Sequence, residues 1–264
     1  MVKVTDQLIV EKKDGVGRIT FDNQAKRNAL TYEMWQGLPV VLDDFASDSA
    51  VRVIVLSGAG GKAFSAGADI KNRQAVGDIK GETYRHLRRT REVSNCIMEC
   101  GKPVIAAVNG TAAGVGAHLA LCCDLVIMAD HAKFIEVFAR RGLVPDGLGA
   151  WILPRLVGLQ KARELMFFAE DIPADEALRI GLCNKVVPGD DLEDATTEWA
   201  ERLASGPTRS LMLTKWLGNR SLDVDRRTLE DNEAWAVELN SRTLDSQEGI
   251  ASFRERRDPV WRGF

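Results

Sequence analysis

The pattern of apolar and polar positions divides the chain into a strand-rich N-terminal part and a helical C-terminal part. Segments 8–10 and 16–21 have the composition of paired strands, with Asp14 and Gly15 at a predicted hairpin turn between them. Thr31 precedes apolar residues that recur at helical spacing, so it is a predicted helix cap. The continuous apolar run at 51–56 then predicts a buried strand.

The same alternation returns through the middle of the chain. A polar helix is predicted over about 83–100, strands over 104–108 and 125–129, and a glycine-rich turn with a short helix between those strands. This order is typical of an α/β fold with helices covering a core sheet. Beyond residue 159 amphipathic segments dominate, and no long Pro- or Ser-rich linker interrupts them. We predict an α/β core over 1–200 with a helical region over 201–264 packed on it.

Composition narrows the range of functions. The 264 residues carry a formal charge of -3 with no long single-sign run, which argues against nucleic acid or a charged membrane surface as a partner. No apolar run approaches the roughly 20 residues of a membrane helix, and the first residues do not resemble a signal peptide, so we expect a cytoplasmic protein. The five cysteines lack the spaced His or Cys partners of a zinc site, and we interpret them as buried thiols.

Two small-residue segments are the strongest chemical signal. Segments 65–71 (Ser-Ala-Gly-Ala-Asp-Ile-Lys) and 109–116 (Asn-Gly-Thr-Ala-Ala-Gly-Val-Gly) each follow a predicted strand and read as turns. Such turns let the backbone approach a ligand closely, and the second leads into a helix whose free N–H groups favour negative charge. Two fixed N–H donors would stabilise the oxyanion of a thioester enolate without a metal. Tight packing between strand and helix is the alternative explanation.

These segments resemble the crotonase family, also called the enoyl-coenzyme A hydratase/isomerase family. The likeness follows the family's order and spacing over nearly the whole chain, and it is carried by 26–30 (Lys-Arg-Asn-Ala-Leu), 63–71, 102–110, Asp124, 142–145, 153–155 and 248–253. The resemblance implies a β-β-α superhelix core, a C-terminal helical region used in trimerisation, and often a hexamer of two trimers. It also implies an acyl-coenzyme A substrate, with coenzyme A as part of that substrate and no separate cofactor.

The family pattern also implies the positions of binding groups. The oxyanion-hole donors would be the backbone N–H groups of Ala68 and Val115. Valine departs from the glycine common at the second position, and its bulk is expected to narrow the acyl pocket. The implied coenzyme A contacts, with Phe253 reaching the pocket of a neighbouring subunit, are Lys26, Arg27, Ala29, Ala66, Asp69, Ile70, Lys71 and Phe253.

The resemblance implies that hydration in this family uses two carboxylates, and this sequence has neither of them. Their positions hold His118 and Phe138, and phenylalanine cannot transfer a proton. Glu136 would share a face with Phe138 if that stretch is extended, which makes it a possible substitute. His118 reads either as a buried, hydrogen-bonded structural residue or as a second acid or base near the start of a helix.

A different carboxylate is the best catalytic candidate. Asp146 follows Gly-Leu-Val-Pro in a turn that the family uses to line the acyl end of the pocket, and the region most resembles the phenylacetate-pathway isomerases of ring-epoxide and enoyl thioesters. One carboxylate can move a proton from C2 to C4 of a 3-enoyl thioester while the oxyanion hole holds the dienolate. We therefore predict an enoyl-coenzyme A isomerase, with a role of Asp146 in the turn before a helix at Gly149 as the structural alternative.

Three other functions remain open at this stage. A hydratase would use His118 or Glu136. Asp146 could instead be a nucleophile, as in the family's aryl-thioester dehalogenase, although Asn95 replaces the histidine of that mechanism, and thioester hydrolysis, revealed by release of free thiol, stays open. A non-catalytic acyl-coenzyme A binder would need none of these groups.

Overall fold

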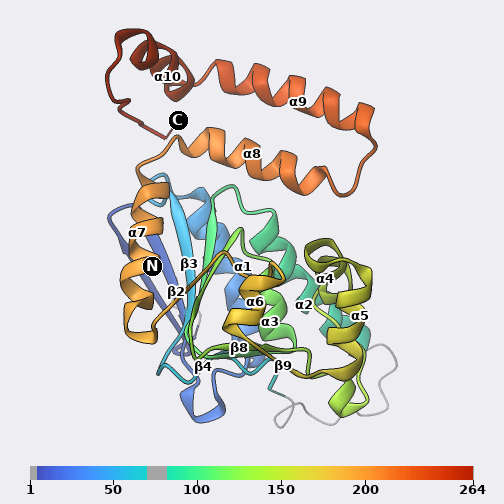
Figure 1. Ribbon diagram of the computed structural model, residues 1–264. Helices are drawn as coiled ribbons and strands as arrows, with labels where there is room; N and C mark the ends of the chain where they lie inside the picture. Colours follow the sequence, from blue (N-terminus) through green and yellow to red (C-terminus); the bar gives the residue numbers. More distant parts are fainter. Residues whose placement is uncertain (1–4, 70–81, 264) are drawn as a thin grey trace.

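The core of the protein is a six-stranded sheet, seen in a computed structural model that describes residues 5–69 and 82–263 (Figure 1). The strand order is β1-β2-β3-β5-β7-β10, and every neighbouring pair except β1 and β2 is parallel. Apart from Ser57, the central strands carry no polar side chain, because helices cover both faces of a parallel sheet. The bounds are β1 (Leu8–Lys13), β2 (Val16–Phe21), β3 (Val53–Gly58), β5 (Val104–Val108), β7 (Leu125–Ala129) and β10 (Lys185–Val187).

A second, smaller sheet crosses one end of the first. Its order is β4-β6-β8-β9, formed by β4 (Ala63–Ser65), β6 (Thr111–Ala113), β8 (Lys133–Ile135) and β9 (Asp171–Pro173). Two of these strands lie within or overlap segments that the sequence predicted as turns, and that part of the prediction was wrong. Three-residue strands of small side chains are too short for an apolar pattern to reveal.

The two sheets are connected by a repeated unit of strand, strand and helix. β3 and β4 lead to α2 (Glu82–Met98), and β5 and β6 lead to α3 (Val115–Leu121). β7 and β8 lead through η2 (Ala139–Arg141) to α4 (Gly149–Val157). This winding confirms the predicted β-β-α superhelix, and it aligns the turns that follow β4, β6 and β8 side by side.

The helices that cover the large sheet follow the apolar pattern. The hydroxyl oxygen of Thr31 accepts from Met34 N–H at 3.4 Å and caps α1, whose apolar face is buried. In Figure 1, α7 lies on one face of the large sheet and α1 on the other. The bounds are η1 (Gln24–Lys26), α1 (Tyr32–Ser47), α5 (Leu159–Phe168), α6 (Ala174–Arg179), η3 (Gly189–Asp191) and α7 (Leu192–Ala204).

The last three helices confirm the predicted helical C-terminal region. They are α8 (Thr208–Arg220), α9 (Arg226–Ser241) and α10 (Leu244–Glu255), and Figure 1 shows α9 on the side of α8 that faces away from the sheet. Lys215 holds α8 to the core, because its ammonium donates to the carbonyl oxygen of Ile97 at 2.9 Å and to the Asp124 carboxylate at 2.8 Å. The division predicted after residue 200 falls within the last turn of α7.

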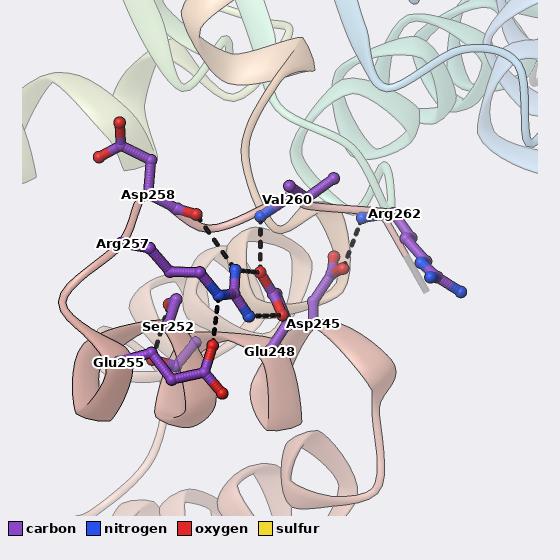
Figure 2. Close-up of polar contacts among 9 residues, drawn as sticks. Asp245, Glu248, Ser252, Glu255, Arg257, Asp258, Val260 and Arg262 are labelled. Carbon is purple, nitrogen blue, oxygen red and sulfur yellow. Dashed lines mark hydrogen bonds and ion pairs between the residues drawn. The ribbon is translucent and has the colours of Figure 1, made fainter.

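The C-terminal tail is fastened to α10 by two carboxylates (Figure 2). Glu248 forms a bidentate pair with Arg257 at 2.5 and 2.8 Å and accepts from Val260 N–H at 2.8 Å. The buried Asp245 accepts from the N–H groups of Arg262 and Gly263 at 2.6 and 2.7 Å. The tail therefore depends on the charge of these acids.

Acidification should release this tail before the core unfolds. The Arg257 pair and the Val260 N–H lower the pKa of Glu248 from 4.5 to about 2. A depressed folded-state pKa contributes stability that is present above 4.5 and is lost as the pH falls toward 2. We expect the protection factor of the Val260 amide, measured by hydrogen–deuterium exchange against the intrinsic rate at each pH, to fall in that pH range, and exchange at Val260 to be fast already at neutral pH in Glu248→Gln. Slow exchange in that variant would contradict this account.

Within residues 5–69 and 82–263, no helix is long and apolar enough to cross a membrane.

Candidate active site

The two predicted donor turns lie in contact with each other. Ala68 follows β4 and Val115 is the first residue of α3. Each comes directly after a glycine of positive φ, 89° at Gly67 and 54° at Gly114, a region that residues with a Cβ rarely adopt. A Cβ added to Gly67 would lie 2.8 Å from the Ala113 carbonyl oxygen and 3.7 Å from Val115 N. Only glycine allows this approach.

The chemical character of the two turns lies in the backbone N–H groups of Ala68 and Val115. Neither donates a backbone hydrogen bond among the residues that the structure describes. Val115 is at the helix N-terminus, where N–H groups have no partner within the helix and the dipole favours negative charge. The fold thus brings the two segments singled out in the sequence together as a pair of donor turns.

The segment 26–30 braces the first donor turn. Leu30 N–H donates to the Gly67 carbonyl oxygen at 2.8 Å, and Asp69 N–H donates to the Leu30 carbonyl oxygen at 3.0 Å. Ala66 N–H donates to the Arg27 carbonyl oxygen at 2.9 Å. Residues 43 positions apart in the sequence, such as Lys26 and Asp69, are therefore held side by side.

Several predicted coenzyme A contacts lie along this brace. The Lys26 ammonium is 2.6 Å from the Asp69 carboxylate, whose side chain is 6% exposed. The Arg27 side chain is exposed, Ala29 is buried and Ala66 is half-buried. Ile70 and Lys71 lie outside the described residues. The brace therefore offers cationic groups beside the first donor turn.

Phe253 is not brought to this site within one chain. Its side chain is 85% exposed on α10, which lies at the opposite end of the molecule from β4 (Figure 1). A contribution to the pocket of a neighbouring subunit stays a prediction.

Asp146 lies in a turn packed against the second donor residue. A Cβ added to Gly147 would lie 2.6 Å from a methyl carbon of Val115, so the turn and the start of α3 are in direct contact. Asp146 is half-buried, and Leu148 takes the N-cap position of α4. The turn between η2 and α4 thus places a carboxylate-bearing residue beside the start of α3.

His118 and Glu136 form a buried pair behind that turn. Their side chains are 0% and 2% exposed, and Nε2 of His118 lies 2.9 and 3.0 Å from the two carboxylate oxygens of Glu136. Nδ1 of His118 lies 2.6 Å from the backbone carbonyl oxygen of Asp146. The three acid–base candidates from the sequence are therefore one connected group.

The remaining surface of the His118 ring is closed by packing. Phe138 stacks on it with ring centroids 5.3 Å apart and an angle of 15° between the planes. A Cβ added to Gly149 would lie 2.0 Å from the Cε1 atom of His118, so only glycine fits there. Glu136 and Phe138 contact the same imidazole, but the strand ends at Ile135 and Phe138 is helical, so the extended stretch on which the shared-face expectation depended is not present.

Comparison with known proteins identifies the family. Residues 11–263 match the family model described as enoyl-CoA hydratase/isomerase. The chain belongs to the enoyl-CoA hydratase/isomerase family.

Members of this family match along almost their entire length. The short-chain-enoyl-CoA hydratase of Clostridium acetobutylicum is 35% identical, with 96% of each chain covered. The 1,2-epoxyphenylacetyl-CoA isomerase of Escherichia coli is 34% identical, with 96% of this chain and 97% of the relative covered. The crystal structure of an enoyl-CoA hydratase from Bacillus anthracis superposes with a TM-score of 0.92 at 33% identity, covering 98% of this chain and 100% of the other. The predicted crotonase-like fold is confirmed.

Sequence reasoning missed one contributor to this enoyl-CoA hydratase/isomerase site. Ser94 on α2 is fully buried, and its hydroxyl donates to the carbonyl oxygen of Gly147 at 3.2 Å. A single serine on an amphipathic helix gives no signal of that contact in the sequence. The nearby thiol of Cys122 is no alternative nucleophile, because burial raises its pKa to about 12.

Proposed function

We propose that this protein is an enoyl-coenzyme A isomerase that moves a C=C bond from the 3- to the 2-position of an acyl thioester. The observation that carries the proposal is the Asp146 turn packed against Val115, one of the two oxyanion donors. The positions of the hydratase carboxylates hold His118 and Phe138 instead, and both side chains are buried. An isomerase requires one carboxylate that faces the substrate, whereas hydration in this family is expected to use two carboxylates.

The proposed reaction is a proton transfer within the substrate. The Asp146 carboxylate removes a proton from C2, and the electron pair passes into the conjugated system to give a dienolate with its charge on the thioester oxygen. The N–H groups of Ala68 and Val115 stabilise that charge. Protonated Asp146 then returns the proton to C4, the C2=C3 bond forms, and the carboxylate is regenerated. Coenzyme A enters as part of the substrate, and the reaction needs no further cofactor.

Hydration is the second candidate function. Relatives named as hydratases support it, and this reaction would require the buried His118–Glu136 pair to act as a second acid or base in place of the family's carboxylates. In that reaction water would add across the 2-enoyl bond instead of a proton moving along the chain. The two candidates share the oxyanion hole and differ in product.

Binding of the nucleotide part of the coenzyme A substrate should depend on the brace formed by segment 26–30. We expect Arg27→Ala to raise KM for a coenzyme A thioester about tenfold, the loss of one charge-assisted contact, with little change in kcat. The matching pantetheine thioester, which lacks the nucleotide phosphates, should show no such rise. Arg163→Ala, on the exposed side of α5, is the control for loss of a surface cation. Equal KM changes for both thioesters would contradict the assignment.

A paired spectrophotometric assay tests the proposed function. Purified protein is given a 3-enoyl-coenzyme A in an isomerase assay and the corresponding 2-enoyl-coenzyme A in a hydratase assay. We expect a higher kcat/KM in the first. Hydration that is faster than isomerisation would favour the second candidate, and turnover in neither assay would favour an acyl-coenzyme A binder.

A further inference from the structure

His118 makes a different contact with each ring nitrogen, and this fixes where its hydrogens are. The Asp146 carbonyl oxygen can only accept, so Nδ1 at 2.6 Å carries a hydrogen and donates it. The Nε2 atom faces the Glu136 carboxylate at 2.9 and 3.0 Å. That contact is favourable only with a proton between the two groups, either on Nε2 or on Glu136. In both states the pair is neutral overall and Nδ1 remains a donor.

This pair holds the backbone of Asp146 and not its carboxylate. His118, on α3, holds the Asp146 carbonyl oxygen, and Ser94, on α2, holds the next carbonyl oxygen, that of Gly147. The Asp146 oxygen also accepts from Gly149 N–H at 3.2 Å, which fills its two lone-pair directions. Two successive peptide groups of the turn are thus fastened to two separate helices.

The imidazole ring of His118 is also enclosed by its neighbours. Phe138 stacks on the ring, Gly149 packs against it, and both nitrogens are engaged. Neither His118 nor Glu136 has surface through which a substrate carbon could be reached, at 0% and 2% exposure. The residues are placed to act through Asp146.

We propose that His118 and Glu136 are positioning residues: Glu136 keeps Nδ1 of His118 as a donor, and His118 fixes the Asp146 turn against the oxyanion hole on the same helix, α3. This assignment rests on the proposed function of Asp146 as the proton carrier. It explains why a buried acid and base occupy the region where hydratase carboxylates would be expected. A displacement of about 1 Å at a catalytic group can cost about a hundredfold in rate.

The test compares truncation with conservative replacement at Glu136. We expect Glu136→Ala and His118→Ala to lower kcat about 30- to 100-fold with KM changed less than about threefold, since the turn shifts while coenzyme A contacts remain. Glu136→Gln should recover most of that loss, because its amide N–H can donate to Nε2 and leave the hydrogen on Nδ1. The acidic limb of the kcat–pH profile should persist in all three variants, because each retains the Asp146 carboxylate.

Two further measurements keep the outcome decisive. Gly149→Ala removes no acid or base but forces the ring or the turn to move, so it should lower kcat like Glu136→Ala. Hydrogen–deuterium exchange of residues 143–149 should be faster in Glu136→Ala than in Glu136→Gln or the unsubstituted protein, whether or not the enzyme isomerises enoyl thioesters. If the proposed function is wrong, only the isomerase assay would show it, because the exchange measurement tests the positioning of the turn independently of activity.

A Glu136→Gln variant as inactive as Glu136→Ala, with unchanged exchange in the turn, would overturn the proposal and make Glu136 a proton-transfer group. Unchanged exchange together with full activity in Glu136→Ala would overturn it equally, since the pair would then be dispensable.

Discussion

Replacement of Asp146 by asparagine should lower kcat for isomerisation by about a thousandfold or more. General acid–base catalysis contributes about 10²- to 10⁴-fold, and Asp146 would serve in both proton transfers. Asparagine keeps the shape of the side chain and the backbone contacts with His118 and Gly149, but it cannot accept the C2 proton. Steady-state kinetics with a 3-enoyl-coenzyme A measure the effect.

Binding of the thioester should survive that change. We expect the Kd of a non-reactive acyl-coenzyme A, measured by calorimetry, to change less than about threefold in Asp146→Asn, because the coenzyme A contacts lie on other segments. Asp130→Asn, which changes an exposed carboxylate outside the donor turns, is the control and should keep full activity. An Asp146→Asn variant that still hydrates 2-enoyl thioesters would show that His118 or Glu136 carries the chemistry.

Substitution of Val115 by proline should cost about 10²- to 10³-fold in kcat, the expected effect of losing one oxyanion donor. Val115 is the first residue of α3, where proline is well tolerated because its φ is preset and the N–H has no helical partner. The change therefore removes the proposed oxyanion donor and leaves the helix hydrogen bonds in place. Kinetics on the same thioester, with circular dichroism to confirm folding, measure the result.

The matched variant is Val115→Ala, which keeps the N–H and removes only two methyl groups. Loss of the contact with Gly147 should lower kcat less than about tenfold, well below the effect of proline. Equal losses in the two variants would mean that Val115 acts through packing against the Asp146 turn and that its N–H is not a donor to the substrate.

The long elements of this fold could be predicted because each has enough residues for an apolar pattern to form. The run at 51–56 predicted β3, which begins two residues later at Val53, and Thr31 was correctly predicted to cap α1. The small sheet could not be found in this way. Its strands have three residues each, and they are defined by pairing between β4, β6 and β8 that no local pattern encodes.

The candidate site, like the fold, could be predicted from the sequence only in part. Glycines at 67 and 114 pointed to donor turns because their backbone freedom is a local property, and the structure brings the turns into contact. The role of His118 depended on partners 18 and 28 positions away, Glu136 and Asp146, which only the superhelix brings together. The sequence therefore placed all three residues near the chemistry but could not show which of them faces the substrate.

The most direct test of one-base isomerisation is the product formed from a 3-enoyl-coenzyme A in deuterated water, identified by mass spectrometry and NMR. The account predicts the 2-enoyl thioester with no added water. On average it should carry less than one deuterium per molecule at C4, because Asp146 returns the original C2 proton in a fraction of the turnovers. A 3-hydroxyacyl thioester carrying the added mass of water as the initial product would contradict one-base isomerisation.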